Sequence, residues 1–215
     1  MALLFAVGSA MFLVPAIGAL TESAPWIAVT FFCGSVFFTS AALVQLMTAA
    51  ELPHRFRPRA DRRPLRPRAW LPGTVDWLGA AVQFGGTVMF NISTFAAMNT
   101  ALTTHEANVR VWAPNMIGSG CFLVSSLLSF ANAEHRWLSW RPRDLDWWIA
   151  ALNLLGSLAF GASALASFVT PSTGLVAHGS LANLGTALGA LCFLVAALLL
   201  APQAERQEQV LVAAV

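Results

Sequence analysis

The chain has 215 residues, of which 57% are hydrophobic and only 10% are charged, and its mean hydropathy is +0.68. Soluble domains carry about 25% charged residues, so most of this chain is expected to lie in lipid rather than in water. The net charge is +2 and every basic residue is an arginine; the lack of lysine excludes a lysine Schiff base and a lysine nucleophile.

Six apolar stretches follow one another along the chain, separated by polar residues and prolines. Each is about as long as a helix that crosses a hydrocarbon core of about 30 Å. We therefore predict six transmembrane helices, at residues 2–20, 26–50, 75–101, 111–133, 147–169 and 178–201. The first stretch has no preceding basic residue and no clear cleavage site, which favours a retained helix over a signal peptide.

These stretches predict an all-α membrane protein with one six-helix transmembrane domain at residues 1–202 and a cytoplasmic tail at residues 203–215. Its orientation follows from arginine, because short cytoplasmic loops retain positive charge. The loop after the second helix holds Arg55, Arg57, Arg59, Arg62, Arg63, Arg66 and Arg68, and the loop after the fourth holds Arg136, Arg141 and Arg143. We predict a multi-pass protein of the bacterial cytoplasmic (plasma) membrane with both termini in the cytoplasm.

The loop at residues 55–68 mixes seven arginines with three prolines, which break helices and predict an extended basic segment beneath the membrane. Basic residues near a bilayer attract anionic headgroups at about 1 kcal/mol per charge. We predict that these arginines contact anionic lipid; a plain topogenic signal is the alternative interpretation. Membrane lipids are the expected partners, with a protein partner or a homo-oligomer as further alternatives, and nucleic acid is not expected.

The helices repeat along the chain. Residues 76–98 align without a gap with residues 146–168, and the run CFLV at 121–124 recurs at 192–195. The first two helices carry glycine and phenylalanine at a similar spacing. The pattern predicts three tandem helical hairpins, at residues 1–50, 74–133 and 146–202, related by a pseudo-threefold axis along the membrane normal. The sequence leaves open whether that axis is open or filled by phenylalanine.

Three segments of this repeat carry a family resemblance: FNISTF at 90–95, GSGCFLVSS at 118–126 and LNLLGS at 152–157. The pattern resembles that of the YrhK-like integral membrane proteins of actinobacteria, and the resemblance covers nearly the whole chain. It implies a multi-helix membrane protein. Because the shared motifs are helix-packing motifs, the resemblance implies no activity and no functional residue.

Polar side chains within the apolar stretches are the candidates for a ligand site or a pore lining. They are Gln83, Asn91, Asn115, Asn153, His178 and Asn183. An unpaired amide in hydrocarbon costs several kcal/mol, so each must face a partner, a cavity or water. Counting from the helix ends puts Asn91, Asn115 and Asn183 in the outer part of the membrane, where they could converge with His178 on a polar pocket. Hydrogen bonding between helices is the alternative interpretation.

No feature of the sequence predicts catalysis or metal binding. No charged residue lies at the centre of a predicted helix, and the histidines do not form a metal-binding pair on any predicted helix. The three cysteines, Cys33, Cys121 and Cys192, are expected to be packed, inert thiols. Asp76 and Asp146 stand at helix starts, where we expect both to act as caps. We expect no enzyme activity, no metal and no cofactor.

Two hypotheses for function follow. The first is an accessory membrane subunit that acts through lipid or protein contacts, because no reactive group lies within the helices. The second is a passive pore or carrier for a small neutral solute along the pseudo-threefold axis. Amides that face a continuous wet cavity would favour the second hypothesis, and amides paired helix to helix would favour the first.

Overall fold

The structure is a computed structural model that describes residues 1–55, 75–134 and 143–213, with the backbone alone at 50–55, 132–134 and 202–213. Its described residues are mainly helical and contain no strand, apart from an isolated antiparallel bridge between Val169 and Val176. The elements are α1 (Ala2–Gly18), α2 (Pro25–Arg55), α3 (Val75–Ala97), α4 (Thr104–Ala107), the π-helix η3 (Asn108–Trp112), α5 (Ala113–Glu134), α6 (Leu145–Ala166) and α7 (Gly179–Ala213). The predicted all-α class is confirmed.

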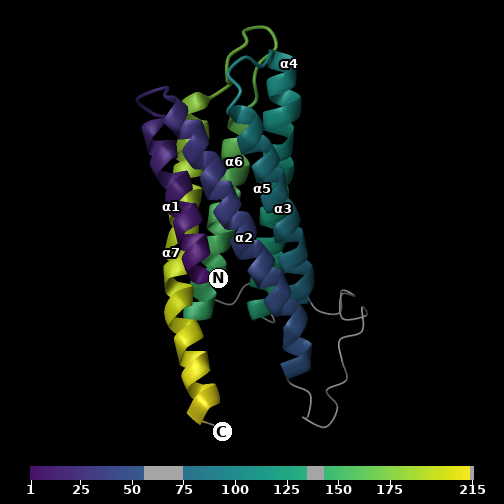
Figure 1. Ribbon diagram of the computed structural model, residues 1–215, viewed down its shortest axis with the longest axis vertical. Coiled ribbons are helices and arrows are strands. Elements are labelled where there is room, and N and C mark those ends of the chain that lie inside the picture. Colours follow the sequence, from purple (N-terminus) through teal and green to yellow (C-terminus); the bar gives the residue numbers. More distant parts are fainter. Residues whose placement is uncertain (56–74, 135–142, 214–215) are drawn as a thin grey trace.

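The long helices stand side by side and alternate in direction (Figure 1). Contacts join α1 to α2, α2 to α3, α3 to α5, α5 to α6, α6 to α7 and α7 back to α1, so the helices form a closed ring. The start of α1 and the end of α7 lie at one end of the bundle, here called the terminal end. The connections 19–24, 98–103 and 167–178 lie at the other, here called the turn end (Figure 1).

Three helical stretches extend at least five residues beyond their predicted bounds, and the first of them is α2, which ends at Arg55 instead of residue 50. α4, η3 and α5 run on from Thr104 because Thr103 and Glu106 form a capping box: the Glu106 amide donates to Thr103 Oγ1 at 3.3 Å, and the Thr103 amide donates to Glu106 Oε2 at 3.1 Å. This start lies seven residues before the predicted one, because Glu106 and Arg110 interrupt the apolar run. α7 continues to Ala213, through most of the segment that was predicted as a tail.

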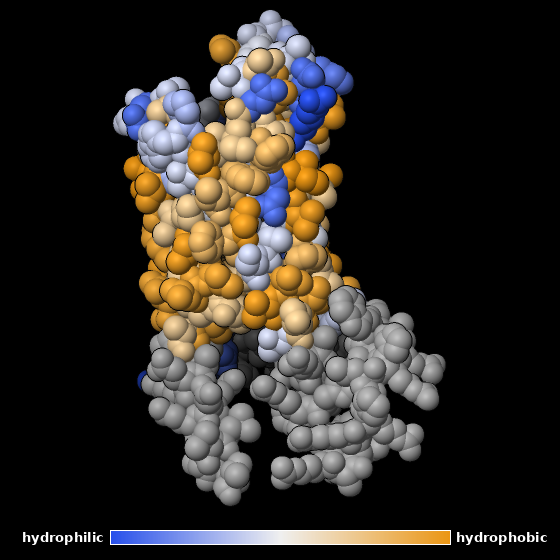
Figure 2. Space-filling view, in the orientation of Figure 1, coloured by the Kyte–Doolittle hydropathy of each residue, from blue (hydrophilic) through white to orange (hydrophobic). Residues whose placement is uncertain are grey.

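Four helical segments are long and apolar enough to cross a membrane: Pro25–Ala49, Thr104–Ala131, Leu145–Ala166 and Gly179–Ala201. Figure 2 shows a largely apolar face on the body of the bundle, with hydrophilic residues gathered at the turn end. α1 is apolar but has only 17 residues, and α3 carries Asp76, Gln83 and Asn91 within its length. The described part of the chain is therefore that of a membrane protein with at least four candidate spans.

Six phenylalanines fill the axis of the ring, one from each long helix. They are Phe12, Phe38, Phe90, Phe122, Phe160 and Phe193, and all are at most 7% exposed. Neighbouring rings pack mostly edge to face, with centroids 5.2–6.4 Å apart, which is the separation that aromatic pairs prefer. The sequence left open whether the axis is open or filled by phenylalanine. At the level of this aromatic core, the axis is filled by phenylalanine side chains.

A glycine four residues before each of these phenylalanines brings the helices of a pair into backbone contact. A Cβ added to Gly86 would lie 3.1 Å from Gly118 O, and one added to Gly156 would lie 3.1 Å from Gly189 O. The pair Gly8 and Gly34 meets in the same way, at 3.2 Å. Small residues permit this close approach of helices in lipid. The three pairs α1–α2, α3–α5 and α6–α7 therefore share one kind of contact.

Candidate functional site

A cavity of about 640 Å³ lies at the terminal end of the bundle, between the aromatic core and the starts of α3 and α6. Its floor is made by Phe38, Phe122 and Phe193, which belong to the aromatic core. Among the described residues, the cavity therefore does not continue along the axis past these rings to the turn end. The structure shows no continuous channel through its described helices.

Two of the predicted polar residues, Gln83 and Asn153, line this cavity. They hold equivalent positions in the aligned segments that form α3 and α6. Ser125 of α5 donates to Gly79 O at 2.8 Å and also lies 3.2 Å from Gln83 Oε1. The Asn153 backbone carbonyl accepts from Ser126 and Ser157. Ser125 and Ser126 also line the cavity, so its inner wall combines carboxamides with hydroxyls.

Three carboxylates stand at the rim of the cavity: Asp76, Asp144 and Asp146. The cap of α6 is Asp144, whose Oδ1 accepts from the Asp146 amide at 3.1 Å. The expectation that Asp146 is the cap is corrected, because the helix starts at Leu145 and places Asp146 in its first turn. Asp76 likewise lies in the first turn of α3. Both still suit the positive end of a helix dipole.

Asn91, one of the three outer amides, joins α3 to α2. Its Oδ1 lies 2.5 Å from the Ser35 hydroxyl, and its Nδ2 donates to Thr39 Oγ1 at 2.6 Å. Thr94 adds a 2.9 Å contact with the same Ser35 hydroxyl. Both hydrogen-bonding groups of this carboxamide are thus satisfied within the protein.

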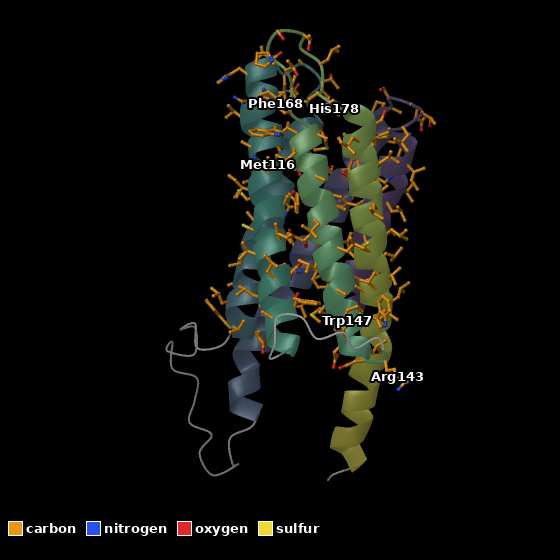
Figure 3. All side chains as sticks on the ribbon, turned by 180° about the vertical axis from the view of Figure 1, so that it is seen from behind. Met116, Arg143, Trp147, Phe168 and His178 are labelled. Atoms are coloured by element: carbon orange, nitrogen blue, oxygen red, sulfur yellow. The ribbon has the colours of Figure 1, made fainter. Side chains whose placement is uncertain are left out.

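The other two outer amides join further helix pairs. Asn115 Nδ2 of α5 donates to Ser167 Oγ, after α6, at 3.4 Å, and Asn183 Nδ2 of α7 donates to Ala19 O, after α1, at 3.0 Å. His178 is exposed in the loop at the turn end, where Figure 3 shows it far from Trp147 and Arg143 at the terminal end. The structure therefore does not bring the outer amides and His178 together in one pocket. It gives each of these amides its own helix interface.

The predicted lipid-contact arginines fall outside what the structure describes: Arg55 is present as backbone at the end of α2, and Arg57, Arg59, Arg62, Arg63, Arg66 and Arg68 lie in the undescribed residues 56–74. Cys33, Cys121 and Cys192 are free thiols. Within the described residues, no group of three His, Cys, Asp or Glu side chains could hold a metal ion.

Several further polar residues line the cavity that are not among the predicted candidates, including Gln45, Ser125, Ser126 and Ser129. The repeat contains the missing signal for two of them. Gln45, Ser129 and Leu200 each lie eleven residues after the glycine of their helix pair, Gly34, Gly118 and Gly189, and all three line the cavity. Aligning the second helices of the hairpins around these glycines would have placed them together.

Comparisons with known proteins give no further assignment: no family model matches the chain, and no curated protein and no solved structure matches it. The site therefore has to be interpreted from its own residues. What it offers is a one-ended cavity with a polar inner wall, a carboxylate rim and an aromatic floor.

Proposed function

We propose that this protein is a six-span, non-enzymatic protein of the bacterial cytoplasmic membrane that acts through lipid or protein contacts, as an accessory subunit. The observation that carries the proposal is the aromatic core, which fills the axis where a pore would have to run. The pairing of Asn91, Asn115 and Asn183 across helix interfaces supports the same interpretation, because these amides hold the bundle together instead of lining a wet path.

Six spans are proposed because α1 and α3 belong to the same closed ring as the four apolar helices. The glycine contact of α1 with α2, and that of α3 with α5, match the contact between α6 and α7. Tryptophans add support: Trp77 and Trp147 stand near the helix starts at the terminal end, and Trp26 and Trp112 stand near the turn end, as expected of residues at the two membrane surfaces.

The absence of catalysis is proposed from the placement of charge. The charged side chains that the structure describes, such as Asp76, Glu106 and Arg110, lie at the ends of the bundle. An acid, a base and a nucleophile are thus not assembled among the described residues of the helix centres. The sequence likewise places no charged residue at the centre of a predicted helix, which supports the same proposal.

A carrier for a small neutral solute is the second candidate, and the cavity is the observation that favours it. Gln83 and Asn153 face a space of about 640 Å³ at the terminal end of the bundle. Transport would require the rings of Phe38, Phe122 and Phe193 to separate, because they close the inner end. A passive, permanently open pore is disfavoured for the same reason.

Cysteine labelling in intact cells would test the number of spans. In a background without the native cysteines, Thr21→Cys, Asn99→Cys and Ser172→Cys each report on one connection at the turn end. Six spans put all three on the outer surface, so an impermeant maleimide should label all three. If α1 and α3 did not cross, residue 21 would lie on the opposite side from residues 99 and 172, and that result would refute the six-span proposal.

Two further measurements separate the accessory role from the carrier role. Native mass spectrometry of protein extracted in nanodiscs should show a bound protein partner, or anionic lipid that is lost when the arginines of residues 55–68 are replaced by glutamine. Proteoliposomes should show the same glycerol permeability as empty liposomes. Faster glycerol entry that is lost in Gln83→Leu would favour the carrier and overturn the accessory proposal.

A further inference from the structure

The cavity is built from equivalent positions of the three hairpins, but these positions differ in chemistry. Gln83 of α3, Asn153 of α6 and Phe5 of α1 each lie three residues before the glycine of their helix, and all three line the cavity. In the second helices, Ser125 of α5 matches Ala196 of α7. The wall formed by α3, α5 and α6 is therefore polar, and the wall formed by α1 and α7 is apolar.

The polar wall has unused hydrogen-bonding capacity. The Asn153 carboxamide makes no hydrogen bond with any residue that the structure describes, and the Gln83 carboxamide engages only its Oε1, with Ser125 at 3.2 Å. A polar group at this depth needs a partner, because leaving it unpaired in an apolar setting is costly. The outer amide Asn91, by contrast, is satisfied by two side chains of α2. The open groups at Gln83 and Asn153 are therefore available to hydrogen-bond a molecule inside the cavity.

The size and charge of the cavity limit what that occupant is. A volume of about 640 Å³ lies within the range of small-molecule sites, about 300–1,000 Å³. Gln83 lies seven residues beyond Asp76 on α3, so the polar groups stand about 10 Å inside the rim. The side chains at this depth are uncharged on both walls. A charged group carried to this depth would lose its hydration without meeting an opposite charge there.

We propose that the cavity binds a compact, neutral amphiphile. Its hydroxyl or amide group exchanges hydrogen bonds with Gln83 and Asn153, and its apolar body lies against Phe5, Ala196 and Leu200. The inference rests on the proposed membrane placement only for access, because the cavity then opens at a bilayer surface from which such a molecule can enter. The binding itself depends on the two walls and requires no transport.

Photolabelling of the purified full-length protein in detergent tests this proposal, with a diazirine-bearing octanol as the probe. We expect the label on residues 193–200 of α7 or on residues 1–5, and we expect unlabelled 1-octanol to compete for it. The double variant Gln83→Leu with Asn153→Leu should lower the saturable labelling about tenfold, since it removes two hydrogen bonds. Exchanging the two amides, as Gln83→Asn with Asn153→Gln, should retain most of the labelling.

The matched control is Asn115→Leu, which removes the same kind of group from a helix interface outside the cavity. It should leave labelling unchanged, and a thermal melt of each variant checks that the protein is folded. Label that spreads over lipid-facing residues equally in all variants would overturn the proposal, as would competition by octylammonium as strong as that by 1-octanol. Because binding is measured in detergent, its failure is separate from a failure of the cysteine-labelling test of topology.

Discussion

The two halves of the bundle, on either side of the aromatic core, treat the same kind of side chain differently. Towards the turn end, Asn91 and Asn183 are hydrogen-bonded to neighbouring helices at 2.6 and 3.0 Å. Towards the terminal end, Gln83 and Asn153 line a cavity, and the carboxamide of Asn153 makes no hydrogen bond with the described residues. Within one protein, some carboxamides of the apolar helices are therefore hydrogen-bonded between helices, and others line a cavity.

The difference shows what determines the role of a polar residue in an apolar helix of this bundle. Each outer amide lies at a contact between neighbouring hairpins, α2 with α3, α5 with α6 and α7 with α1, where a partner is within reach. Gln83 and Asn153 instead line the cavity, and each lies seven residues, about two turns, before the core phenylalanine of its own helix. The half towards the turn end therefore uses its amides to join the helices, and the half towards the terminal end leaves carboxamide groups open to the cavity.

The aromatic core separates the two halves, and its disruption should have the largest effect. Phe90 is 4% exposed and its ring packs against Phe12, Phe122 and Phe160. Phe90→Ala should lower the free energy of unfolding by about 3 kcal/mol, the lower end for buried phenylalanine, because in lipid the loss is mainly one of packing. Unfolding in a detergent titration measures this change.

The control for that variant is Phe95→Ala, five residues further along α3, where the side chain is 63% exposed. The centroid of its ring lies 5.5 Å from that of the Phe32 ring. We expect a loss below about 1 kcal/mol, because lipid replaces most of the lost contacts. Equal losses in the two variants would mean that the core does not hold the halves together.

Disruption of the glycine contacts between paired helices should cause the next largest loss in the free energy of unfolding. A methyl group at position 189 would clash with Phe160 Cδ1 and lie 2.9 Å from Gly156 O, so Gly189→Ala requires α6 and α7 to move apart. We expect a loss of about 1–3 kcal/mol from overpacking. Gly161→Ala on α6 is the matched control, since nothing lies within 4 Å of its added Cβ. That variant should gain up to about 1 kcal/mol from helix propensity.

The outer amides should contribute less than the core. Asn91→Leu removes the hydrogen bonds to Ser35 and Thr39, and we expect a loss of about 1 kcal/mol, as for other side-chain hydrogen bonds between membrane helices. The same detergent titration measures it. A double-mutant cycle with Thr39→Val isolates the pair: a coupling energy near zero would show that the outer half does not depend on this hydrogen bond.

Much of the helical architecture could be predicted from the sequence, because apolar length and polar punctuation are properties of a single chain. α3 and α6 begin within two residues of their predicted starts, at Val75 and Leu145. The early start at Thr104 was missed, although Thr103 and Glu106 have the spacing of a capping box, because hydropathy outweighed the local capping signal. The aromatic core was visible only as a repeated Gly-x-x-x-Phe pattern.

The cavity could be predicted only in part, because its position depends on how each helix is rotated about its own axis. The sequence identified Gln83 and Asn153 as polar residues that need a partner, but it did not distinguish them from Asn91 or Asn115. Whether a carboxamide meets a neighbouring helix or the axis is decided by packing. The contrast between the polar wall and the apolar wall likewise needed the ring order of the helices.

The smallest expected change in the free energy of unfolding is that of Asn153→Leu, and it tests directly whether the two halves of the bundle differ. Asn153→Leu should change the free energy of unfolding by less than about 0.5 kcal/mol, because the Asn153 carboxamide has no hydrogen bond to lose among the described residues. Asn91→Leu, the same substitution at the contact of α3 with α2, should cost about twice that or more. Comparable losses in one detergent titration would mean that the inner carboxamide is bonded within the protein. The two halves would then be alike, and the case for a ligand in the cavity would lose its main support.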